Sequence, residues 1–94
     1  MLIYITEAKY LFNYEVELTF NDGKKGIVNL ENELYGTMFA PLKNKKVFAT
    51  VKLDKDIDTI SWENGADLAP EFLYYESFKN DKSLTKQFQK WGYI

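Results

Sequence analysis

Two pairs of carboxylates have the residue types and spacing that could support chemistry in this chain. Glu15 and Glu17 alternate along one segment, and Glu63 lies four residues before Asp67. Two carboxylates can act as general acid and general base when their surroundings push the two pKa values apart. The sequence gives no sign of two such environments, and the alternation of Glu15 and Glu17 is also typical of the wet face of a strand. We therefore expect no enzyme activity, and keep a small enzyme or ligand-binding protein that uses acidic residues as an alternative.

The acidic run Asp54-Lys55-Asp56-Ile57-Asp58 begins like the oxygen ladder of a calcium-binding EF-hand loop. It departs from that loop at two required positions, because Thr59 replaces the glycine and Gly65 replaces the bidentate glutamate. A solvated turn between two strands accounts better for these residues. We expect no bound metal here and no cofactor.

Composition excludes most of the familiar catalytic schemes. The chain has no Cys, no His and no Arg, and all 12 of its cationic residues are Lys. Without Cys and His, the usual zinc sites cannot form. Without His, the chain lacks the commonest general base, and without Arg it lacks bidentate recognition of phosphate.

The charge pattern argues against direct binding of nucleic acid. The formal net charge is −2, whereas nucleic-acid-binding domains usually present a basic footprint. The lysines gather in two short groups, which are typical of solvated faces; they are Lys43, Lys45 and Lys46, and Lys82, Lys86 and Lys90. We expect the partner to be another small protein or a second copy of the chain, with no direct contact to nucleic acid or membrane.

The first residues lack the basic segment and the sustained apolar run of a signal peptide. No apolar stretch approaches the roughly 20 residues that a membrane-spanning helix needs. We expect a cytoplasmic protein.

Strand-like alternation dominates the first third of the chain. Residues 2–10 have strand character, and Tyr14, Val16, Leu18 and Phe20 alternate with polar side chains. Asn21-Asp22-Gly23 then predicts a tight hairpin into residues 24–30. Residues 51–54 and 57–62 add two more strand candidates, so we expect a mainly antiparallel sheet of four to six strands.

The helical signals are short. Gly36 and Pro41 limit the segment 31–51 to helical turns. Pro70 suits the first position of a helix, where its missing N–H costs nothing. Near the end of the chain, Leu84, Phe88 and Trp91 share one side of an amphipathic helix that Gly92 would cap. The expected fold is a single α+β domain over residues 1–94, with short helices packed on one face of the sheet and a C-terminal amphipathic helix.

The most specific stretch of the sequence runs from Ile60 to Tyr74, where a strand, a glycine turn and a helix start follow one another. Its signature residues are Trp62, Asn64, Gly65, Asp67, Leu73 and Tyr74. Together with the hairpin of residues 18–30 and the segments Pro41-Leu42 and Val47-Phe48, this stretch resembles the small bacterial family called domain of unknown function 2442. The resemblance covers residues 1–76 as a family-like core and leaves residues 77–94 as an extension.

The resemblance implies a compact α+β domain without transferable catalytic residues. It also implies that some relatives carry a helix-turn-helix after the domain, and that some are encoded beside another small protein in toxin–antitoxin-like pairs. This chain departs from the family in placing Ala69 where many relatives have an acidic or hydroxyl residue before Pro70.

Two interpretations of the signature stay open. Trp62 and Asp67 could be structural, with the Asp67 carboxylate bonding backbone N–H groups of the turn or the helix start. Alternatively, the signature residues and Tyr75 form a patch that binds a partner, or the helix face of Leu84, Phe88 and Trp91 does so. Our functional hypothesis is a non-enzymatic protein-binding module, such as the adaptor or antitoxin-like half of a two-gene pair, with a DNA-associated regulator acting through a partner as the alternative.

Overall fold

The first three strands form an antiparallel meander. The computed structural model describes residues 2–94, and in it β1 (Ile5–Phe12), β2 (Glu15–Phe20) and β3 (Lys25–Asn29) lie in the order β1-β2-β3. The predicted hairpin at Asn21-Asp22-Gly23 is confirmed, because Gly23 N–H donates to the carbonyl of Phe20. Strand β2 alternates as expected, with its apolar side chains fully buried.

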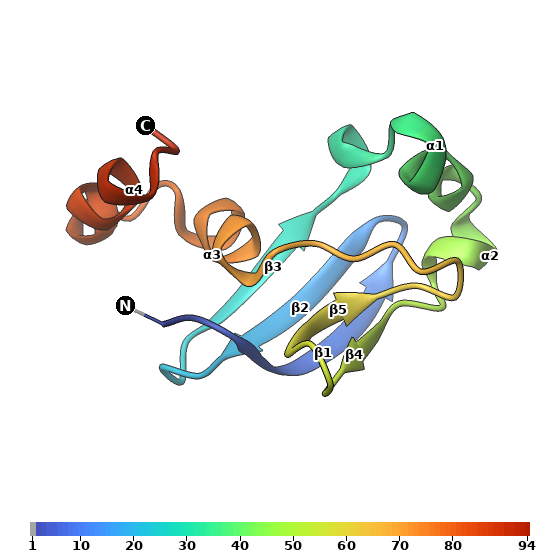
Figure 1. Ribbon diagram of the computed structural model, residues 1–94, viewed down its shortest axis with the longest axis horizontal. Helices are drawn as coiled ribbons and strands as arrows, with labels where there is room; N and C mark the ends of the chain where they lie inside the picture. Colours follow the sequence, from blue (N-terminus) through green and yellow to red (C-terminus); the bar gives the residue numbers. More distant parts are fainter. Residues whose placement is uncertain (1) are drawn as a thin grey trace.

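A second, two-stranded sheet follows a run of short helices (Figure 1). The helical turns expected between residues 31 and 51 are present as η1 (Glu31–Glu33), α1 (Gly36–Phe39), η2 (Ala40–Lys43) and α2 (Lys45–Phe48). Strands β4 (Lys52–Asp54) and β5 (Thr59–Ser61) then pair as an antiparallel hairpin.

The prediction of a single sheet of four to six strands is wrong, since the sheets have three and two strands. Each strand of the second hairpin is only three residues long. Outside the ladders, one backbone hydrogen bond runs from the N–H of Ile5 to the carbonyl of Asp58, at 2.9 Å. The second hairpin therefore contacts β1 without joining its hydrogen-bonded ladder.

Two helices complete the described chain. Helix α3 (Pro70–Phe78) begins at Pro70 as predicted, without a side-chain cap from Ala69. After η3 (Lys82–Leu84), helix α4 (Thr85–Trp91) ends at Gly92, whose φ of 86° is the left-handed conformation of a C-terminal cap. The expected C-terminal helix is thus present.

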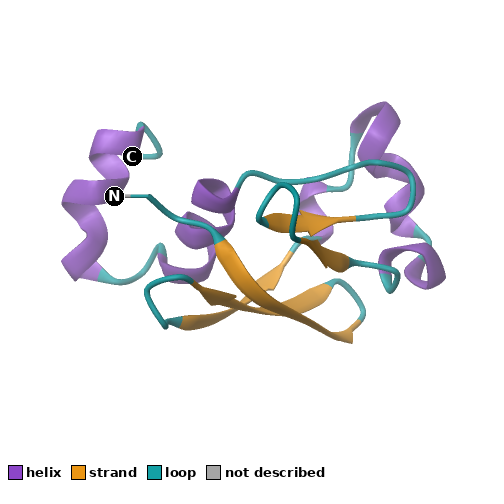
Figure 2. Cartoon of the chain, turned by 60° about the horizontal axis from the view of Figure 1, so that its bottom comes forward, coloured by secondary structure: helices purple, strands orange, loops and turns teal. Residues whose placement is uncertain are grey.

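The core lies on one side of the three-stranded sheet. In Figure 2 this sheet is at the bottom, with the second hairpin and the helices above it. The helices therefore pack on one face, as the sequence predicted. The buried apolar residues come from every part of the described chain; they are Ile3, Ile5, Val16, Leu18, Phe20, Val28, Leu30, Leu34, Leu42, Phe48, Ile60, Trp62, Ala66, Leu73, Tyr74 and Phe88.

Helix α3 approaches β3 unusually closely at one point. A Cβ built on Gly26 would lie 2.6 Å from the Cβ of Ser77, which is closer than two carbon atoms can approach. The hydroxyl oxygen of Ser77 is buried there without a hydrogen-bond partner within residues 2–94. Only glycine at position 26 allows this contact between the helix and the inner face of β3.

None of the helices in the described part of the chain is long and apolar enough to cross a membrane.

Candidate functional site

Trp62 is the buried centre of the signature segment. Its side chain is 2% exposed, and its indole N–H donates to the backbone carbonyl of Phe48 at 3.0 Å. The rings of Phe48 and Trp62 also pack together, with centroids 5.5 Å apart. Trp62 therefore fixes α2 against the second sheet, and in this conformation it cannot contact a partner.

Asn64 organises the turn that follows. Its side-chain carbonyl accepts from the N–H of Ala66 at 3.1 Å, and its amide donates to the carbonyl of Met38 at 2.7 Å. Gly65 completes the turn with a φ of +87°, a conformation that side chains other than glycine adopt only at a cost. The Asn64 side chain thus both closes the turn and ties it to α1.

Asp67 does not have the structural role that the sequence suggested. The residue is exposed and forms an isolated antiparallel bridge with Ser61 through its backbone, but within residues 2–94 its carboxylate accepts no hydrogen bond. The entry into α3 is instead held by Thr59, whose hydroxyl donates to the carbonyl of Leu68 at 2.7 Å. The interpretation of Asp67 as a cap is wrong, because Asn64 accepts from the N–H of the turn and the start of α3 has no side-chain cap.

The remaining signature residues lie inside the protein. Leu73 and Tyr74 are completely buried, and Tyr75 is half-buried. Tyr75 packs edge-on against Phe88 and stacks on Tyr93, with centroids 4.9 Å apart and rings inclined by 14°. The structure therefore does not bring the signature residues together as an exposed patch.

The apolar face of α4 is also covered. Phe88 is 1% exposed, while Leu84 and Trp91 pack on the core as half-buried residues. The Trp91 ring meets Tyr74 edge-on at 6.0 Å between centroids. This helix docks on α3 of its own chain, so its apolar stripe is part of the core and is not available as an interface.

The two carboxylate pairs considered as catalytic groups lie on a turn and on a strand, and neither pair lies in a buried site. Glu63 and Asp67 are both exposed on the turn, while Glu15 and Glu17 are half-buried neighbours on β2. Within the described residues, no group of three or more acidic side chains is arranged to hold a metal ion, and the aspartates of residues 54–58 form a turn. The Asp54 carboxylate accepts from the N–H of Asp56, as expected of a solvated turn.

The surface that the sequence did not single out is the open face of the three-stranded sheet, opposite the helices. The registers place Glu7, Thr19 and Lys25 side by side across the three strands, and Lys9, Glu17 and Ile27 in the next row. Cations and anions therefore alternate over this face, with one aliphatic side chain among them. We call these six residues the open face.

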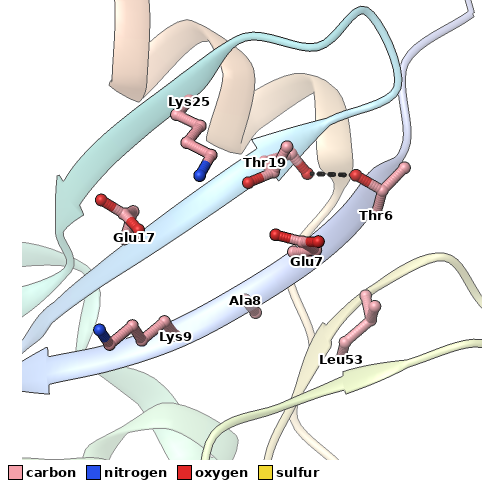
Figure 3. Close-up of a pocket in the computed structure, with 8 residues that line it drawn as sticks. All are labelled: Thr6, Glu7, Ala8, Lys9, Glu17, Thr19, Lys25 and Leu53. Atoms are coloured by element: carbon pink, nitrogen blue, oxygen red, sulfur yellow. Dashed lines mark hydrogen bonds between the residues drawn. The ribbon is translucent and has the colours of Figure 1, made fainter.

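A shallow pocket of about 530 Å³ lies on the open face (Figure 3). Figure 3 shows the side chains of the three strands reaching into it, while helix α3 lies behind the sheet. The hydroxyl of Thr6 donates to the carbonyl of Thr19 at 3.2 Å and closes one end. The pocket is lined by Thr6, Glu7, Ala8, Lys9, Glu17, Thr19, Lys25 and Leu53.

Ile27 is the exposed apolar residue of the open face. It is 54% exposed and lies opposite Glu17, one row away from the lysine at position 25. The sequence predicted a strand over residues 24–30, but it could not show which side chains of the neighbouring strand would lie beside Ile27. That neighbourhood depends on register, which only the folded sheet specifies.

The family relationship follows from a match between the sequence and a family model. The family described as "Protein of unknown function (DUF2442)" matches residues 5–79. The chain belongs to the DUF2442 family. The match includes both sheets, the signature segment and the whole open face of this DUF2442 protein, and it stops before η3 and α4. No curated protein matches the sequence.

One solved structure with the same fold is the "putative DNA binding protein NE0471" from Nitrosomonas europaea. It superimposes on this DUF2442 chain with a TM-score of 0.73 at 17% sequence identity. The match covers 85% of this chain and 52% of the other, so the chain spans about half the length of that protein. At this level of identity the likeness shows a shared fold.

The comparison corrects one expectation about partners. The sequence led us to exclude direct contact with nucleic acid, on the basis of net charge and the absence of Arg. That exclusion is contradicted, because a protein with this fold is described as a putative DNA binding protein. Net charge was a poor guide here, since a domain with a net charge of −2 can still expose a local group of lysines.

Proposed function

We propose that this chain is a non-enzymatic binding module that recognises another protein through the open face of its three-stranded sheet. The observation that supports the proposal most directly is Ile27, an aliphatic side chain 54% exposed on the edge strand of the open face, opposite Glu17 and one row from Lys25. Protein interfaces combine apolar contacts at the centre with polar groups around them. The open face offers both kinds of group, with the apolar one on its edge strand β3.

The charged residues of the open face can distinguish one partner from another. Lys9 and Glu17 lie opposite each other, yet within residues 2–94 neither forms an ion pair. Both charges are therefore available to groups on another molecule. Complementary charges at an interface contribute specificity and rate of association more than affinity, and a mismatch between like charges is costly. We expect a partner surface that also alternates in charge.

The arrangement of the carboxylates supports a binding function over catalysis. A catalytic pair needs two environments that separate the pKa values of its members. Glu63 and Asp67 are both exposed on one turn, and Glu15 and Glu17 are both half-buried on one strand. Each pair thus shares a single kind of environment.

Two aspartate substitutions at exposed isoleucines test the proposed surface. Ile27→Asp places a charge on the open face, and Ile57→Asp is a matched control, because Ile57 is 46% exposed on the turn between β4 and β5. We expect a partner captured by the tagged full-length protein to be lost with Ile27→Asp and kept with Ile57→Asp. Equal capture by both folded variants would contradict the proposal.

The setting we propose for this surface is an adaptor or antitoxin-like role in a two-gene pair, as the family resemblance implies. In that case the product of the adjacent gene should co-purify with the chain in a fixed ratio after co-expression. Ile27→Asp should separate the two proteins, and Ile57→Asp should not. Independent elution of the two wild-type proteins would contradict this setting.

A DNA-associated regulator is the second candidate. It is favoured by the name of the structural neighbour and by Lys43, Lys45 and Lys46, which are all exposed around the start of α2. Binding that depends on these lysines would weaken steeply with salt, since each phosphate contact releases counterions. Duplex binding by the isolated chain that is lost in a Lys45→Glu, Lys46→Glu variant, and kept in a Lys86→Glu, Lys90→Glu variant, would support this candidate over the first.

A further inference from the structure

Strand β3 has a free hydrogen-bonding edge beside the open face. The N–H of Leu30 donates to the carbonyl of Tyr14, and the N–H of Phe20 donates to that of Lys24, both at 2.9 Å. In an antiparallel pair, the backbone N–H and carbonyl groups of every second residue point toward the neighbouring strand. These two bonds show that the even-numbered residues of β3 direct their backbone groups toward β2. The backbone N–H and carbonyl groups of Lys25, Ile27 and Asn29 therefore point away from β2.

The outward groups of this edge have no partner in the described chain. Strand β3 is the last strand of its sheet, and outside the ladders no backbone hydrogen bond within residues 2–94 involves Lys25, Ile27 or Asn29. All three residues are exposed. Since each residue contributes one N–H and one carbonyl, the edge can pair with a further strand along its whole length.

We propose that β3 accepts an extended peptide segment of a partner protein, with an acidic residue opposite Lys25, as a fourth, antiparallel strand of this sheet. This inference rests on the proposed function and assigns its mode of binding. Addition of a strand to a sheet edge takes affinity from main-chain hydrogen bonds and specificity from alternate side chains. The side chains of the added strand that lie opposite Lys25, Ile27 and Asn29 would extend the open face.

Lys25, at the start of β3, favours an added strand that has a negative charge opposite it. Lys25 is exposed and forms no ion pair within residues 2–94. Lysine on an edge strand deters unselective pairing between sheets. The same residue favours a strand that places a carboxylate directly opposite it, because opposite charges across two strands stabilise the pair.

Register gives the recognition pattern of the peptide. An antiparallel strand runs from the residue opposite Asn29, through the residue opposite Ile27, to the residue opposite Lys25. Side chains opposite one another point to the same face of a sheet. From N- to C-terminus the pattern is therefore polar, small, aliphatic, small, acidic. The side chains between them lie on the face of the sheet on which α3 packs at Gly26, so small residues fit there.

A synthetic peptide tests the pattern with the full-length protein. The probe is an end-blocked peptide of seven residues, with serine, isoleucine and glutamate at its second, fourth and sixth positions and threonine elsewhere. We expect the amide proton of Ile27 to become protected from exchange when the probe binds, as measured by NMR. Absence of binding at millimolar peptide, or protection confined to other elements, would overturn the proposal.

A charge swap makes the test specific. Lys25→Glu should weaken binding of the glutamate peptide by about fivefold and favour a peptide with lysine in its place, as cross-strand charge pairs predict. Lys55→Glu is the matched control on the turn between β4 and β5, and should leave binding of both peptides unchanged. Unchanged affinities in the Lys25→Glu protein would contradict the assigned register.

Two further outcomes separate this inference from the proposed function. A dimer of the chain alone, with the Ile27 amide already protected, would make a second copy the occupant and overturn the peptide assignment. Loss of partner capture in Ile27→Asp without any peptide effect at β3 would leave the open face as the binding surface and reject strand addition alone.

Discussion

The hydroxyl of Tyr74 donates a hydrogen bond of 2.7 Å to the Asp22 carboxylate, across 52 residues of sequence. It ties the middle of α3 to the turn between β2 and β3. The Tyr74 ring is buried and meets Phe20 edge-on, with centroids 5.0 Å apart. One side chain thus combines a polar contact at the surface with aromatic packing in the core.

Removal of this hydroxyl should destabilise the fold. We expect Tyr74→Phe to lower the free energy of unfolding by about 1.5 to 3 kcal/mol, the usual range for a hydrogen bond with a charged acceptor. Urea denaturation measures the change. Tyr35→Phe is the control, because Tyr35 is 69% exposed and makes no side-chain hydrogen bond within residues 2–94. Equal stability of Tyr74→Phe and the wild type would show that the bond contributes nothing.

The same tyrosine should make stability fall at high pH. Burial, with the hydrogen bond to Asp22, raises the pKa of Tyr74 above its ordinary value of 10.0. The unfolded chain therefore loses this proton at lower pH than the folded protein does, so the contribution to stability is complete below pH 10 and decreases as pH rises above 10. The slope for one proton is at most about 1.4 kcal/mol per pH unit. Denaturation between pH 9 and 11.5 should show a shallower decrease for Tyr74→Phe; parallel curves would contradict this assignment.

Trp62 should be more important for stability than the other tryptophan. Trp62→Phe removes the donor to the Phe48 carbonyl and leaves space in the core. We expect it to cost about 2 to 4 kcal/mol, because an unpaired buried carbonyl and a cavity both destabilise. Trp91→Phe is the comparison, since Trp91 is half-buried. A smaller loss for Trp62→Phe than for Trp91→Phe in chemical denaturation would be the contrary result.

The contact between β3 and α3 allows two substitutions with opposite effects. Gly26→Ala forces a Cβ against Ser77, and should destabilise by about 1 to 3 kcal/mol, as overpacking does. Ser77→Ala removes a buried, unpaired hydroxyl and should leave stability equal or higher. Thermal denaturation checks both variants. Ser83→Ala is the control, because the Ser83 hydroxyl donates to Asp81 and its loss should lower stability slightly.

The segment after the family match should be required for the stability of the core. A chain cut after Asn80 loses Phe88, which is buried, and exposes Tyr75. Loss of one buried phenylalanine alone costs about 3 to 5 kcal/mol. We expect a large decrease in melting temperature and binding of a hydrophobic dye. An unchanged melting temperature would show that the core is stable without the C-terminal segment.

The sequence alone predicts those features of the structure that depend on neighbouring residues. The turn around Gly23, the helix start at Pro70 and the cap at Gly92 are each specified within a few residues, and each is present. The sequence does not predict features that depend on contacts between distant segments. The pairing of β4 with β5 alone, and the covering of the α4 stripe by α3, follow from contacts that no local pattern encodes.

The candidate sites show the same division. Trp62 and Asn64 were identified as important, but their partners Phe48 and Met38 lie 14 and 26 residues away, so the sequence could not tell a buried anchor from an exposed patch. The hydrogen bond to the turn that we expected of Asp67 is made by the nearby side chain of Asn64. The neighbours of Ile27 on the open face come from two other strands, and only the register brings them together.

The distances along the chain between paired segments bear on the order of folding. The meander β1-β2-β3 joins strands that follow one another through short turns, whereas the contact of Tyr74 with Asp22 closes a loop of 52 residues. Short loops close at lower entropic cost and form sooner than long ones. We therefore expect the hairpins of the meander to form in the early steps of folding. The aromatic contacts of α3 and α4 should form after the transition state, so that they mainly slow unfolding.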